Sequence, residues 1–248
     1  MVTWDHVPDG GTPESQWRSW SREWPELDLA GCTRVVVVAP HPDDEVLAAG
    51  GLLHRLAGRG TELALLAVTD GDASHPGSPT LSPAELARRR RAESAAALAE
   101  LGLHPVTTRL GLPDGAVAAH EDAVADALTG VLGAADAATW VIATWRGDGH
   151  PDHEAVGRAA HRAAGAAGAR LLEVPVWTWH WAVPEDPRVP WHRARGVALD
   201  PAVLDLKRAA VQHFRTQVAS LSEHPADAPV LPAFVLERLL RDHETVLV

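Results

Sequence analysis

Short apolar runs alternate with longer stretches of helical periodicity between residues 34 and 176, and this alternation restricts the chain to very few folds. Continuous apolar runs of roughly four to eight residues indicate buried strands, whereas apolar residues spaced three and four apart indicate helices. We expect strands at 34–39, 62–69, 105–110, 139–144 and 170–176, and helices at 45–58, 82–101, 121–134 and 153–167. This order predicts an α/β fold, in which helices cover both faces of a Rossmann-like, mostly parallel sheet.

The length and composition predict one domain. A chain of 248 residues with 46% hydrophobic content can bury a full core without dividing. We expect a single domain over residues 1–248, in which residues 1–30 form an extended N-terminal arm that packs back onto the core. Residues 177–248 complete the predicted fold with a loop or short hairpin up to Trp191, a strand at 194–199, and helices at 201–214 and 232–240.

Net charge and cysteine content exclude several classes of function. The formal charge of −11 argues against a nucleic-acid partner, because binding to a phosphate backbone requires a basic face. The only cysteine, Cys32, cannot form an internal disulfide, and no apolar stretch approaches the roughly 20 residues that span a bilayer. No secretory leader is recognisable either. We therefore expect a cytoplasmic protein without a membrane partner, and the sequence leaves open a homo-oligomer.

Two histidine- and aspartate-containing motifs follow predicted strands. His-Pro-Asp-Asp-Glu occupies residues 41–45 directly after the first strand, and His-Pro-Asp-His occupies residues 150–153 after the fourth strand. Ligands of parallel α/β sheets bind at the carboxyl ends of the strands. We therefore expect both motifs to lie at one edge of the sheet and to form an active site there.

The residue types in these motifs favour a metal-dependent hydrolase. Hydrolytic zinc sites use three His, Asp or Glu ligands and keep a fourth position for a water whose pKa falls to about 7. His41 and Asp44 are spaced to share one ion, and His153 is the best-placed third ligand. Asp43 then lies beside the metal without being needed as a ligand, and we predict that it acts as the general base.

The second motif supplies two further candidate catalytic residues. His150 could stabilise the oxyanion or protonate the leaving nitrogen if its ring is an imidazolium, and Asp152 could orient that ring. An aspartate at a strand-to-helix junction is often only a helix cap, and one such motif could be a surface turn. Because two motifs share the same structural context, we favour the metal site, and we interpret Glu45 as structural.

The two motifs resemble the signature of the LmbE-like (PIG-L) family of zinc-dependent N-acetylglucosaminyl deacetylases, over a region from about Arg34 to at least His153. The resemblance implies a hydrolase that removes an acetyl group from an N-acetylated amino sugar or glycoconjugate. It implies the same roles for the ligands, the base and the second-motif residues. It also implies that Arg90 and Asp114 bind the substrate, although a solvated helix charge explains Arg90, and a turn explains Asp114, equally well.

The chain departs from some relatives, and alternatives stay open. Asp148 stands where those relatives have a tyrosine, and the chain contains no tyrosine. Fe²⁺ could replace Zn²⁺, since a site of two histidines and one aspartate accepts both. The nearest alternative is a metal-dependent amidase that acts on a sugar–thiol conjugate or a longer N-acyl group. A non-catalytic sugar- or nucleotide-binding module is disfavoured, because all the ligands are present and the first turn lacks the G-x-G-x-x-G spacing.

Overall fold

A seven-stranded mixed sheet forms the centre of the molecule in the computed structural model, which describes residues 10–20 and 22–248. The strand order is β3-β2-β1-β4-β5-β7-β6. The first five strands pair in parallel, whereas β7 runs antiparallel between β5 and β6. The strands are β1 (Arg34–Ala39), β2 (Glu62–Thr69), β3 (Val106–Leu112), β4 (Thr139–Thr144), β5 (Arg170–Val174), β6 (Ala194–Ala198) and β7 (His243–Leu247).

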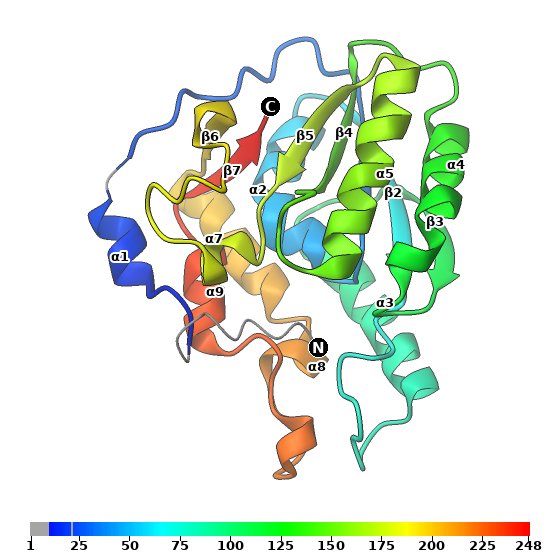
Figure 1. The fold of residues 1–248 in the computed structure, drawn as a ribbon, viewed down its shortest axis with the longest axis vertical. Coiled ribbons are helices and arrows are strands. Elements are labelled where there is room, and N and C mark those ends of the chain that lie inside the picture. The colour runs from blue at the N-terminus through cyan, green and yellow to red at the C-terminus, as the bar shows by residue number, and fades with distance from the viewer. Residues whose placement is uncertain (1–9, 21) are drawn as a thin grey trace.

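Helices cover both faces of the sheet (Figure 1). One face packs against α4 and α5, and the other packs against α2, with α3 and α7 beside it. Within the described residues, no helix has the length and apolar content that a membrane crossing needs. The helices are α1 (Glu14–Ser19), α2 (Asp44–Ala57), α3 (Pro83–Glu100), α4 (Glu121–Leu132), α5 (Pro151–Ala167), α6 (Thr178–Trp181), α7 (Pro201–Val211), α8 (Arg215–Val218) and α9 (Ala233–Leu239), with 3₁₀ turns η1 (Val117–His120), η2 (Trp191–Arg193) and η3 (Pro225–Asp227). The predicted α/β fold class is confirmed.

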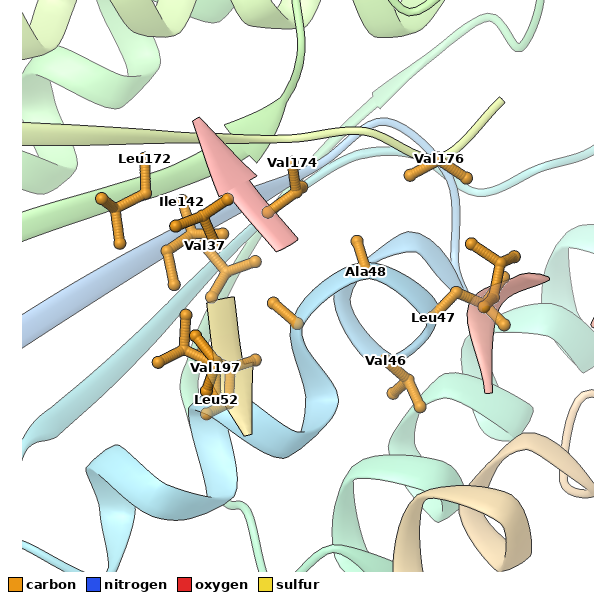
Figure 2. Close-up of a cluster of buried hydrophobic side chains, with 14 of the residues drawn as sticks. Val37, Val46, Leu47, Ala48, Leu52, Ile142, Leu172, Val174, Val176 and Val197 are labelled. Carbon is orange, nitrogen blue, oxygen red and sulfur yellow. The ribbon is translucent and has the colours of Figure 1, made fainter. Parts of the chain in front are cut away.

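The valine run of β1 supplies side chains to both hydrophobic cores. Side chains alternate along a strand, so Val37 joins the core on the α2 side and Val36 joins the core under α4 and α5. Figure 2 shows Val37 with Ile142 and Leu172 of β4 and β5, on the side of the sheet where Leu52 of α2 lies. Burial on both faces explains why the strand reads as a continuous apolar run.

The N-terminal and C-terminal parts differ from the expectation in detail. Residues 1–9, within the predicted arm, lie outside the described residues. The described part of the arm contains α1, whose Trp17 is buried 5.0 Å from Trp179, ring centroid to ring centroid. The sequence also did not predict β7, and the segment before Trp191, predicted as a loop or short hairpin, contains the short helix α6. The single-domain organisation stays a prediction.

A buried ion pair ties the C-terminal part to α2. Lys207 and Glu244 are 0% and 4% exposed, and their Nζ and Oε1 atoms lie 2.7 Å apart. The Glu244 carboxylate also accepts hydrogen bonds from the backbone N–H groups of Gly51 and Leu52 in α2. A side chain at Gly51 would force Leu199 to move, because its Cβ would lie 2.4 Å from a methyl carbon of that residue. These contacts fix α2, the helix that begins at Asp44.

We expect Lys207→Met to lower the free energy of unfolding by about 3–5 kcal/mol, because removing one partner leaves the other charge buried and unpaired. Arg208→Met is the matched control on the same helix, since Arg208 is exposed, and it should change stability by no more than about 0.5 kcal/mol. Denaturant titration of both variants measures the difference. Equal stability of the two variants would contradict a structural role for the pair.

Candidate metal centre

The three predicted metal ligands come from two adjacent strand ends. His41 follows β1, Asp44 begins α2, and His153 lies in the first turn of α5 after β4. Strands β1 and β4 pair in parallel, with Val38 opposite Ala143, so the loops that follow them leave the same edge of the sheet. The carboxyl ends of these strands therefore bring the two sequence motifs together.

The inner atoms of the three side chains form a nearly equilateral triangle. His41 Nδ1 lies 3.2 Å from Asp44 Oδ2, His153 Nε2 lies 3.3 Å from the same oxygen, and the two ring nitrogens lie 3.3 Å apart. Ligand atoms bound at 2.0–2.1 Å around a tetrahedral ion are about 3.3–3.4 Å from one another. The triangle therefore has the dimensions of one face of a tetrahedral metal site.

In each histidine ring, the outer nitrogen, which is not part of the triangle, contacts a carboxylate. The inner nitrogen, which is part of the triangle, is then free to bind a cation. His153 Nδ1 lies 2.8 Å from Asp148 Oδ2, and His41 Nε2 lies 3.1 Å from Asp114 Oδ1 and 3.4 Å from Asp152 Oδ2. This network assigns the ring proton of each neutral imidazole to its outer nitrogen. Two nitrogen lone pairs and a carboxylate oxygen then face one another, an arrangement that fits a bound metal ion.

The electrostatics of the cluster also demand positive charge. Burial lowers the pKa of His153, but Asp44 and Asp148 outweigh burial and raise this pKa to about 9. The pKa of His41 is set by the same opposition: burial lowers it, but Asp114 and two further carboxylates raise it well above its usual value. Both shifts favour the positively charged rings, and a divalent cation can take the place of their added protons.

Asp43 lies beside the triangle and contacts Arg90. Its Oδ2 atom is 3.0 Å from Arg90 Nη2, and both side chains are buried. Burial raises the pKa of Asp43 to about 7, with Arg90 opposing the shift and Asp44 adding to it. Arg90 also donates to the backbone carbonyl of Gly71. The interpretation of Arg90 as a solvated helix charge is therefore wrong.

The hydrogen bonds of His150 favour a neutral ring with its proton on Nε2. His150 caps α5, and its Nδ1 atom accepts the backbone N–H of Asp152 at 3.2 Å, which places the ring proton on Nε2. Burial, together with His153 and His41, lowers the pKa of His150 to about 3. These shifts disfavour the imidazolium form on which its predicted role depends.

The carboxylate of Asp152 contacts other groups than the His150 ring. It accepts the backbone N–H groups of Gly115 at 2.7 Å and Val117 at 3.1 Å, and it approaches His41 as described above. The hydrogen bond to His150 comes from the Asp152 backbone instead. Asp152 therefore links the loop after β3 to His41, one of the predicted metal ligands.

A cavity of about 540 Å³ opens over the triangle. All the residues predicted from the sequence line it, namely His41, Asp43, Asp44, Arg90, Asp114, His150, Asp152 and His153. Much of its lining is apolar and comes from Trp177 and from the segment 225–231, whose residues other than Asp227 line the cavity. The other tryptophans near the site, at 145, 179, 181 and 191, are buried in the core. The cavity therefore has two parts: a charged floor, made by the residues predicted from the sequence, and an apolar wall, made by Trp177 and the segment 225–231.

Comparison with known proteins agrees with this geometry. The family model for PIG-L, described as GlcNAc-PI de-N-acetylase, matches residues 36–164, which include both histidine motifs. This chain belongs to the PIG-L family. The resemblance inferred from the motifs is confirmed, and with it the expectation of a family of hydrolytic N-deacetylases.

Individual relatives support the assignment to different extents. A 1D-myo-inositol 2-acetamido-2-deoxy-alpha-D-glucopyranoside deacetylase of Corynebacterium efficiens is 49% identical over 45 residues, which cover 18% of this chain and 14% of that enzyme. A conserved protein from Thermus thermophilus is 30% identical, with a TM-score of 0.53 over 74% of this chain and 79% of that one. An N,N'-diacetylchitobiose deacetylase from Pyrococcus horikoshii, 22% identical with a TM-score of 0.56 over 82% and 79% of the two chains, supports the fold alone.

Asp148 is a residue of this PIG-L site that the sequence did not identify as functional. It is fully buried, and besides His153 it accepts the backbone N–H groups of Val176, Trp177 and Thr178 and the Thr178 hydroxyl. Such a carboxylate fixes the orientation and tautomer of a ligating histidine. The sequence signal that could have identified Asp148 was its position between β4 and the second motif.

We expect Asp148→Ala to weaken metal binding by about 10- to 100-fold, because His153 loses the carboxylate that orients it. Competition with a chelating dye measures the affinity. Asp122→Ala is the control, since the Asp122 side chain is 89% exposed and should leave the affinity unchanged. Equal affinities in the two variants would contradict the orienting role.

Proposed function

We propose that this protein removes the acetyl group from an N-acetylated amino sugar of the N-acetylglucosaminide type by metal-dependent hydrolysis. The triangle of His41, Asp44 and His153 at the floor of the cavity, with Asp43 beside it, carries the proposal. A divalent metal held by these three side chains, Zn²⁺ or Fe²⁺, would supply Lewis acidity and lower the pKa of a water. Membership of the PIG-L family supports the acetamido sugar as the substrate class.

Asp43 accepts the proton of the attacking water in this proposal. Its Oδ2 atom is paired with Arg90, which leaves Oδ1 for the water. A carboxylate with a pKa near 7 suits a general base at neutral pH, because it can both take up a proton and return it. The proton that Asp43 removes from water is then available for the leaving amine nitrogen.

His150 stabilises the carbonyl oxygen as negative charge develops on it. Because its Nδ1 atom is used by the backbone of Asp152, the proton on Nε2 is its free donor. A donor held in place before the reaction stabilises an oxyanion without reorganisation. The proposed substrate contacts of Arg90 and Asp114 stay predictions, and each side chain also holds part of the centre: Arg90 contacts Asp43, and Asp114 contacts His41.

We expect Asp43→Ala to lose activity by a factor of about 10² to 10⁴ while retaining its metal, because the general base contributes a rate of this order and is not a ligand. His153→Ala is the comparison, and it should lose both metal and activity. Elemental analysis of the purified variants, paired with rates of amine release, separates the two outcomes. Normal turnover by Asp43→Ala would disprove the assigned base.

The reaction itself is tested with a panel of N-acetylglucosaminides. Metal-replete protein should release free amine and acetate in equal amounts, and a chelator should abolish the release, since the proposed hydrolysis requires a metal to activate the water. Restoring the metal should restore the rate. Failure to release amine from any acetamido sugar would contradict the proposed function.

A further inference from the structure

The wall above the metal centre is apolar over a much larger surface than an acetyl group needs. Trp177 is half-buried and lines the cavity. Pro229, Val230 and Leu231 line it as well, and Leu231 and Trp177 also share the lining of a smaller neighbouring cavity. An acetyl group offers one methyl for burial, so most of this wall remains available to another part of a bound molecule.

A buried carboxylate holds this wall in place. Asp227 is 0% exposed and accepts hydrogen bonds from the hydroxyls of Ser78, Thr80 and Ser222. Two of these hydroxyls belong to the loop between β2 and α3, so Asp227 joins that loop to the segment that carries Val230. Burying a carboxylate is costly unless it is hydrogen-bonded in this way.

The backbone of the wall is tied down at a second point. The backbone N–H of Leu231 donates to the carbonyl of Gln217 at 2.9 Å, and Gln217 is itself anchored through its amide to the hydroxyls of Thr216 and Ser74. Residues 225–231 are therefore a preformed surface. Preformed apolar surfaces with a few polar groups at their base are typical of small-molecule sites.

We infer that the wall formed by Trp177 and residues 225–231 binds an apolar aglycone attached to the amino sugar. The inference rests on the proposed function, since the acetamido group must reach the metal centre at the floor of the same cavity. Under the proposed function the acyl group is acetyl, as the family description also suggests, so the apolar part is assigned to the rest of the substrate.

Hexyl and methyl 2-acetamido-2-deoxyglucosides test the inference, because they differ only in the length of the aglycone. Each methylene buried on the wall improves binding roughly fourfold, so wild-type kcat/KM should be at least tenfold higher for the hexyl glycoside. The hexyl glycoside is kept below its micelle-forming concentration. Equal kcat/KM values of the wild-type protein for the two glycosides would by themselves overturn the inference.

Val230→Asn introduces a polar side chain into the wall, and the ratio of hexyl to methyl kcat/KM should fall toward one. Val183→Asn is the matched control, since Val183 is 44% exposed and does not line the cavity, and it should preserve the ratio. Thermal melting of both variants checks that they fold. A ratio that survives in a folded Val230→Asn protein would overturn the role of the wall.

Asp227→Asn tests the positioning role separately. The three hydroxyls lose part of their acceptor, so the wall loosens, and KM for the hexyl glycoside should rise several-fold while kcat stays the same. A parallel fall in kcat for both glycosides, with an unchanged KM ratio, would show that Asp227 serves general stability and would remove it from the inference.

Two further arms separate this inference from the proposed function and from a longer acyl group. Methyl 2-hexanamido-2-deoxyglucoside carries the apolar chain on the nitrogen instead, and faster hydrolysis of this compound than of the hexyl glycoside would overturn the aglycone assignment. Calorimetry measures the ratio of the affinities for the hexyl and methyl glycosides, which does not depend on turnover. Tighter binding of the hexyl glycoside without acetate release would contradict the hydrolase and support the wall, whereas no binding of either glycoside would overturn the inference.

Discussion

The structure depends on keeping two imidazole nitrogens and one carboxylate oxygen within about 3.3 Å of one another. The lone pairs of these atoms repel unless a proton or a metal ion lies between them, and the protein holds them together from several directions. The pairing of β1 with β4 brings their loops to one edge of the sheet, and the buried ion pair of Lys207 and Glu244 fixes the helix that begins at Asp44. The Asp148 carboxylate contacts the Nδ1 atom of His153 and so orients its ring. Much of the fold thus serves one arrangement of three atoms.

Adjacent carboxylates acquire different roles because their surroundings differ. Asp44 faces two histidine rings, which lower its pKa, although burial alone would raise it. Asp43 is paired with Arg90 instead, and burial raises its pKa to about 7 against the opposing charge of Arg90. Groups whose surroundings push their pKa values apart are suited to different roles in acid–base chemistry. In the proposed function, one turn of chain therefore supplies both a metal ligand and a proton acceptor.

The sequence predicted the parts of the fold that depend on local pattern. Strands β1, β2 and β4 have the predicted bounds, because each is a buried run with clear ends, and the two histidine motifs could be placed from the strands before them. Strand β7 was missed, since its pairing involves residues far away in the chain. The same distance hid the role of Asp148, whose backbone partners follow β5, and the burial of Arg90, which depends on how α3 packs against the first motif.

The central claim is that these three side chains bind a single divalent cation. Anomalous diffraction at the zinc edge, from crystals of the zinc-replete protein, tests it most directly. We expect one strong peak at about 2.0–2.2 Å from His41 Nδ1, Asp44 Oδ2 and His153 Nε2 together. A peak bound by other residues, or no peak at this position in fully zinc-loaded protein, would contradict the account.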